Sequence, residues 1–98
     1  MTFDAIVRQE ARLIILRALS QQPDYRASDS LLEPVLELYG IRRGRDFIRA
    51  ELAWLAEAGT LTTETMGTTT IATLTHRGED HVAHRTVLPG IKRPSVPE

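Results

Sequence analysis

Apolar residues recur at helical spacing through the first twenty positions of the chain. Residues 13–19 are all apolar except Arg17, so apolar positions would cover more than one side of a helix. The stripe before and within this run consists of Phe3, Ile6, Val7, Leu13 and Ile14. We predict a helix over about 3–20 that is either central to its domain or also packs against a second subunit.

A second helix is predicted after the turn sequence QQPDYR. Ser30 and Glu33 have the spacing of a capping box, and this start places Pro34 in the first turn, where its missing N–H removes no helical bond. The apolar stripe of the helix is Leu31, Val35 and Leu38, with Leu32, Leu36 and Tyr39 beside it. Gly40 suits the position that ends a helix in a left-handed conformation.

A third helix is predicted over about 44–58, and only the sequence IRR separates it from the second. Ile48, Leu52 and Leu55 form its apolar stripe. Trp54 lies beside that stripe and is expected to anchor the core or an interface. Two helices joined by so short a connection must turn sharply on each other, as in a helix-turn-helix.

A β-hairpin follows over residues 59–75, a stretch with nine threonines and no lysine or arginine. Gly67-Thr68 as a two-residue loop suits a type II′ turn, which favours glycine first. That register pairs Met66 with Thr69, Thr63 with Ala72, and Leu61 with Leu74. Pairing the two leucines on one face would attach the hairpin to the core.

The chain ends with a short helix, predicted at about 77–85, and a tail rich in proline. We expect one domain over residues 1–85 and an extended tail, docked or disordered, over residues 86–98. The fold class is therefore mainly α with a small β-hairpin, in the order α-α-α-β-β-α.

Composition limits what this domain can do. The chain has 98 residues, no cysteine and a formal net charge of −1. Disulfides and thiolate metal sites are excluded, and one small core is expected. No targeting or membrane segment is visible, which favours the cytoplasm. Because dedicated nucleic-acid binders are usually basic, any argument for such binding depends on where the positive charge lies.

Two short sequences resemble known regulators. The segment LAWLAEAGTL at 52–61 resembles the junction between recognition helix and wing in ArsR- and MarR-type proteins, and LTHRG at 74–78 resembles the motif that closes the wing. The resemblance covers roughly residues 3–85 and implies a winged helix-turn-helix, a fold that hosts many functions.

A longer resemblance includes the tail. The combination of LLEPVLELYGI, ELAWLAEAGTL, IATLTHRGEDHVA and LPGIKRP is similar to small proteins of Mu-like phages and prophages that are often labelled ArsR-type regulators. This resemblance implies a winged helix in a phage context.

Four of the twelve basic residues cluster at the start of the third helix. With the apolar stripe facing inward, Arg45 and Arg49 project outward, while Arg42 and Arg43 lie at the leading end. In a helix-turn-helix this part enters the major groove of DNA, where the arginine fork pairs with guanine or phosphate. We predict Arg43, Arg45 and Arg49 as the major-groove set and Arg42 as a phosphate contact. The alternative is a solvated face paired with acids such as Glu33, Glu37 or Asp46.

The tip of the hairpin carries Thr65, Thr68 and Thr69, which are predicted to bind the DNA backbone. Uncharged groups release no counterions, so affinity would depend mainly on the arginines and its salt dependence would be shallow, about −4 to −5 in slope for four to six phosphates. Alternatively, a threonine-rich strand of this kind accepts a partner strand as a protein-binding edge.

Three histidines crowd near the end of the domain, with two carboxylates between them: His76, Glu79, Asp80, His81 and His84. The spacing permits two metal ligands on one helical face, but surface histidines on a polar helix are the simpler interpretation. No metal, cofactor or catalytic role is expected, because no nucleophile, phosphate-loop or convergent carboxylate pattern is present.

The sequence therefore predicts a DNA-binding transcriptional regulator of a phage or prophage, which binds double-stranded DNA and forms a homodimer through its first helix. The alternative is a winged helix that binds a phage or host protein in phage development or assembly, without specific DNA binding. No membrane association is expected.

Overall fold

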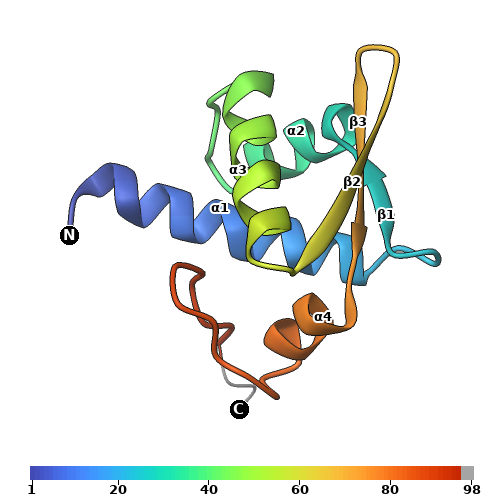
Figure 1. Cartoon of the computed structure of the whole chain (residues 1–98). Helices are drawn as coiled ribbons and strands as arrows, with labels where there is room; N and C mark the ends of the chain where they lie inside the picture. The colour runs from blue at the N-terminus through green and yellow to red at the C-terminus, as the bar shows by residue number, and fades with distance from the viewer. Residues whose placement is uncertain (96–98) are drawn as a thin grey trace.

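A computed structural model describes residues 1–95, so the last three residues of the predicted tail lie outside the described part. Over residues 1–95 the chain is mainly α with a small antiparallel sheet (Figure 1). The elements are α1 (Phe3–Ser20), β1 (Arg26–Ser28), α2 (Asp29–Leu38), α3 (Arg45–Glu57), β2 (Leu61–Met66), β3 (Thr69–Leu74) and α4 (His76–Val82).

Helix α1 is the centre of the domain. It crosses the molecule with α2 and α3 on one side and α4 on the other (Figure 1), and it also contacts β3. Its apolar run is covered by the chain itself, because Ile15, Leu16 and Leu19 are all fully buried. This burial supports the first of the two alternatives for the helix, although Phe3 and Ile6 near its N-terminal end stay exposed.

Helix α2 begins two residues earlier than predicted. Its N-cap is Ser28, whose Oγ accepts a hydrogen bond from the Leu31 amide at 3.2 Å, so Ser30 lies inside the helix and Pro34 lies beyond the first turn. The prediction of a Ser30 cap was wrong because Ser28 directly follows a strand, and its extended backbone is the conformation that an N-cap needs. Gly40 ends the helix as predicted, with φ +81°.

The side of α2 that packs inward also differs from the prediction. Leu32 and Leu36 are buried, whereas Leu31 and Leu38 of the predicted stripe are 62% and 83% exposed. Both rows have helical spacing, so periodicity alone could not select between them. The row that packs inward belongs to the core shared with α1 and α3.

The hairpin β2–β3, called the wing from here on, has the predicted register. Leu61 pairs with Leu74, Thr63 with Ala72 and Met66 with Thr69. Gly67 at the loop has φ +63°, a left-handed value that glycine adopts without strain. The sheet contains one strand that the sequence did not predict: β1 pairs with β3, giving the order β1-β3-β2.

Helix α4 ends earlier than predicted, and one of its histidines is not on the surface. His81 is fully buried. Its Nδ1 accepts a hydrogen bond from the Leu88 amide at 3.3 Å, and its Nε2 donates to the Lys92 carbonyl at 3.0 Å. The expectation of a solvated histidine was wrong at this position because residues 86–94 fold back over α4 and cover the ring. The two hydrogen bonds of the ring attach this segment to α4.

The same segment also packs against α1. Leu88 and Ile91 are buried in the core, and the Lys92 amide donates to the Gln9 carbonyl at 3.2 Å. Arg12 donates to the Gly90 carbonyl at 2.8 Å, and its guanidinium lies 3.8 Å from the centre of the Trp54 ring. Trp54 is thus an anchor of the fold, as one of the two expected alternatives has it.

Replacement of Gly78 tests the packing between α4 and the wing. A Cβ at this position would lie 2.2 Å from the Thr60 carbonyl oxygen and 2.6 Å from Leu74. We expect Gly78→Ala to lower the free energy of unfolding by about 3 kcal/mol, as overpacking against backbone does. Thermal unfolding measures the loss. Gly67→Ala is the matched control, because its Cβ would meet nothing within 4 Å and only the backbone cost of about 1–2 kcal/mol remains. Equal losses would contradict the steric account.

Candidate nucleic-acid interface

The N-terminal end of α3 and the tip of the wing lie at the same end of the molecule (Figure 1). Helix α4 and residues 86–95 lie at the opposite end. All the residues predicted to contact DNA come from this one end: Arg42, Arg43, Arg45, Arg49, Thr65, Thr68 and Thr69. An elongated ligand that contacts α3 would therefore also reach the wing.

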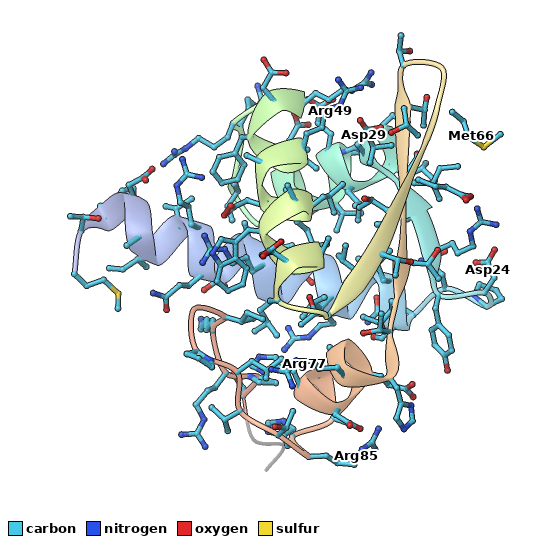
Figure 2. The ribbon with its side chains drawn as sticks, viewed as in Figure 1. Asp24, Asp29, Arg49, Met66, Arg77 and Arg85 are labelled. Carbon is cyan, nitrogen blue, oxygen red and sulfur yellow. The ribbon has the colours of Figure 1, made fainter. Side chains whose placement is uncertain are left out.

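Arg49 joins three elements at this end. Its Nε donates a hydrogen bond of 2.8 Å to Oδ2 of Asp29, in the first turn of α2, and another guanidinium nitrogen donates to the Thr68 carbonyl at the wing tip. Figure 2 shows Arg49 and Asp29 next to each other, between α3 and the wing. Asp29 is fully buried, whereas the Arg49 side chain is partly exposed. The arginine therefore fixes the wing tip relative to both helices.

The buried carboxylate is held in its charged form. Burial by itself would raise the pKa of Asp29, but the hydrogen bond from Arg49 and the backbone N–H of Thr70 lower it. The positive charges of Arg49 and Arg45 act in the same direction. The net result is a pKa below the ordinary value of 3.8, so Asp29 stays ionised and binds Arg49 at neutral pH.

The arginines that precede α3 make weaker contacts. Arg43 lies 3.0 Å from the Asp4 carboxylate on α1, and its guanidinium lies 5.5 Å from the Phe47 ring centre. Hydrogen bonds from Arg8 and Arg43 lower the pKa of Asp4. Arg42 is 3.8 Å from Glu37, and its side chain is 84% exposed. Pairs this exposed contribute little to stability and exchange partners readily.

Arg45 is the one member of the predicted set without an ion pair among residues 1–95. It is exposed at the first position of α3. At the wing, Thr65 and Thr68 are exposed and Thr69 is half-buried. The site thus offers one unpaired guanidinium, two weakly paired ones, and hydroxyl groups on the wing.

Two residues that shape this end were not predicted from the sequence. Asp29 supports Arg49, and Arg26 on β1 lies 3.1 Å from Glu64 on β2 and compensates the charge of this wing carboxylate. The sequence carries one signal for the first, since an acid in the first turn of a helix is favourable. Arg26 has no comparable signal, because its strand was not predicted.

Among residues 1–95, no three or more histidine and carboxylate side chains gather closely enough to hold a metal ion. None of the helices in the described part combines the length and apolar character needed to cross a membrane.

Comparison with solved structures defines the class of fold. The chain resembles hsRosR-S1 from a solved complex, with a TM-score of 0.64 and 22% identity over 76% of this chain and 65% of that one. It resembles hsRosR-S4 equally well, with a TM-score of 0.64 and 21% identity over 81% and 73% of the two chains. These are winged-helix proteins, so the chain has a winged-helix fold.

Sequence relatives define the family. The chain is 37% identical over 89 residues to the uncharacterized protein gp26 of Escherichia phage Mu, covering 91% of this chain and 92% of gp26. It therefore belongs to the family of phage Mu gp26. An uncharacterized protein of Haemophilus influenzae is 42% identical over 64 residues, which is 65% of this chain and 62% of that one. No family model matches the chain. The narrower assignment to ArsR-type regulators stays a prediction.

Replacement of Asp29 tests the link between α2, α3 and the wing. The folded state holds the pKa of Asp29 below its ordinary value of 3.8, so its ion pair stabilises the protein fully above about pH 5 and the stabilisation is lost as the pH falls toward 2. We expect Asp29→Asn to lower the free energy of unfolding by about 2 kcal/mol at pH 7, as the loss of a hydrogen bond to a charged group does.

Urea unfolding of both proteins from pH 7 to pH 2 measures this difference, which should shrink on acidification. The control is Asp24→Asn, which changes an exposed loop carboxylate that accepts a long hydrogen bond of 3.3 Å from the Arg26 amide (Figure 2). A difference that stays constant with pH would contradict the role of the ionised Asp29.

Proposed function

We propose that the protein binds double-stranded DNA and acts as a transcriptional regulator in a phage or prophage. The observation that carries this proposal is the placement of the N-terminal end of α3 and the wing tip at the same end of the molecule. Arg45 is exposed there and forms no ion pair with any of residues 1–95. In this fold the second helix of the helix-turn-helix enters the major groove. The relation to phage Mu gp26 supports the phage setting. The proposal includes no catalytic step.

The proposed contacts follow from how firmly each side chain is held. Arg45 is free to reach base edges, where one bidentate contact with guanine discriminates by about 1–3 kcal/mol. Arg42 and Arg43 would exchange exposed carboxylates for phosphates or groove edges at little cost. Thr65, Thr68 and Thr69 would donate hydroxyl hydrogen bonds to the phosphate backbone.

Arg49 has a different role in this proposal. Because its partner Asp29 is fully buried, movement of the guanidinium to DNA would leave an unpaired buried carboxylate, which is costly. Arg49 would therefore hold the wing at the spacing that the DNA backbone requires, while any direct contact would come from its exposed side.

Few phosphates would be neutralised at such an interface. With four to six phosphates neutralised in the complex, the slope of log affinity against log salt should be about −4 to −5. A strongly basic protein would show a steeper slope. The near-neutral charge of the chain is compatible with DNA binding only if binding depends on these few contacts.

Binding to mixed-sequence duplex DNA at about 50 mM and about 200 mM salt tests the proposal. We expect Arg45→Ala to weaken binding by about 5- to 150-fold and to reduce the salt slope by about 1 for each subunit bound, through loss of one base or phosphate contact per subunit. The control is Arg85→Ala, which removes the same charge at the opposite end of the molecule (Figure 2). Absence of binding at the lower salt, or equal losses in both variants, would refute the proposal.

A second variant separates the role of Arg49 from that of Arg45. Arg49→Ala should weaken DNA binding without changing the salt slope, because it releases the wing rather than a counterion. Hydrogen exchange of wing amides should rise in the free Arg49→Ala protein and stay unchanged in Arg45→Ala. A reduced slope with unchanged exchange would assign Arg49 to phosphate binding instead.

We further infer that the DNA-binding form is a homodimer joined through the N-terminal part of α1. Phe3 and Ile6 of this part are 77% and 49% exposed, and Met1, just before the helix, is 88% exposed. Pairing two copies would cover these side chains and double the contacts to DNA. Light scattering should give about twice the monomer mass of 11.0 kDa, and Phe3→Ser/Ile6→Ser should give the monomer, while Met66→Ser on the wing should not. A monomer at all concentrations would contradict this inference.

A further inference from the structure

The outer face of α2 carries an apolar stripe that the rest of the described chain does not cover. Leu31, Pro34 and Leu38 are spaced three and four residues apart, so they lie on one side of the helix, and Val35 lies beside them half-buried. Leu31 and Leu38 are 62% and 83% exposed. Contiguous exposed apolar patches on a small soluble domain mark sites of interaction.

The stripe continues into a hollow between α2, the C-terminal end of α1 and β1. The hollow has a volume of about 190 Å³. Its walls are Ala18, Gln22, Ala27, Leu31, Leu32 and Val35. Pockets for small ligands are usually larger, about 300–1,000 Å³, so this hollow fits a single large apolar side chain. Interfaces between proteins are commonly anchored by one such side chain in a pocket.

The charge beside the stripe is acidic. Every ionisable residue of α2 is a carboxylate: Asp29, Glu33 and Glu37. Asp29 is neutralised by Arg49, and Glu37 lies 3.8 Å from Nε of the exposed Arg42. Glu33 has no ion pair within residues 1–95. A partner that fits this edge must bring positive charge.

These features disfavour two other occupants. A phosphate backbone would be repelled by the carboxylates, so the stripe is not an extension of the DNA-binding end. A second copy of α2, packed antiparallel about a two-fold axis, would place Glu33 and Glu37 of one subunit near those of the other. Like charges across such an interface oppose it.

We propose that the outer face of α2 docks an amphipathic helix rich in lysine or arginine from a partner protein. The apolar side of that helix lies along Leu31, Pro34 and Leu38, and one large side chain enters the hollow beside Val35. Basic residues flanking its apolar side face Glu33 and Glu37. This is helix-in-groove recognition, read out by anchors at i, i+3, i+4 and i+7. The docking site is separate from the DNA-binding end and does not depend on DNA binding.

A pair of model helical peptides tests the proposal on the full chain. Both carry leucines at helical spacing, with lysines flanking them in one peptide and glutamates in the other. Fluorescence anisotropy should show binding of the lysine peptide only, and NMR chemical-shift changes should map to α2 and Ala27. Leu31→Ser/Leu38→Ser should weaken binding at least tenfold, and Glu33→Gln/Glu37→Gln should weaken it and make it insensitive to salt.

Met66→Ser is the matched control, because Met66 is an exposed apolar residue on the wing with a similar exposure of 62% (Figure 2). The variants change exposed side chains, except for the half-buried Glu33, and unchanged thermal unfolding verifies the fold. Equal binding of both peptides, full binding by the leucine variant, or shifts that map to Phe3 and Ile6 would overturn the proposal. A dimer that the leucine variant abolishes would assign the stripe to a second copy and likewise overturn it.

Discussion

The ion pair between Arg49 and the buried Asp29 determines how the start of α3 and the wing tip are arranged relative to each other. Helix α2 contributes the carboxylate, α3 the guanidinium, and the wing tip the Thr68 carbonyl that the same guanidinium binds. Leu61 and Leu74 anchor the base of the wing, and its tip extends beyond the body of the domain (Figure 1). If the wing were attached only by its base, the tip would have no fixed position relative to α2 and α3. Arg49 supplies the second attachment, and its electrostatic attraction to the ionised Asp29 holds the guanidinium in place. The buried carboxylate is tolerated because it has this partner.

Positive charge elsewhere in the chain is largely used inside the fold. Arg8 and Arg12 bind the buried Glu51, and Lys92 binds Glu10. These contacts fasten α3 and the C-terminal segment to α1. A near-neutral chain therefore results from basic residues that hold elements together, and few remain to face a ligand. A ligand that binds at the start of α3 must contact Arg45 and its neighbours in a defined geometry, because a near-neutral chain produces no broad positive field around them.

The sequence predicted what depends on local patterns. The bounds of α1, the register of the wing and the glycine that ends α2 follow from periodicity, from Leu61 facing Leu74, and from the left-handed conformation at Gly40. Its errors came from contacts between distant residues. Strand β1 has three residues and forms only because β3 offers a free edge. The burial of His81 was not predicted because the groups that bind its ring, in Leu88 and Lys92, belong to a segment with no secondary structure of its own. That segment has no periodic pattern from which its packing over α4 could be read.

The candidate site divides in the same way. The arginine cluster was visible in the sequence, but which arginine is held and which is exposed depended on Asp29 and Asp4, twenty and thirty-nine positions away from their partners. The same holds for α2, where two rows of leucines were equally periodic and tertiary packing buried one of them. The exposed row of α2, which includes Leu31 and Leu38, lies beside carboxylates, whereas the start of α3 carries arginines. One helix-turn-helix thus presents two chemically opposite faces, and a protein bound to α2 would leave the arginines of α3 open to DNA.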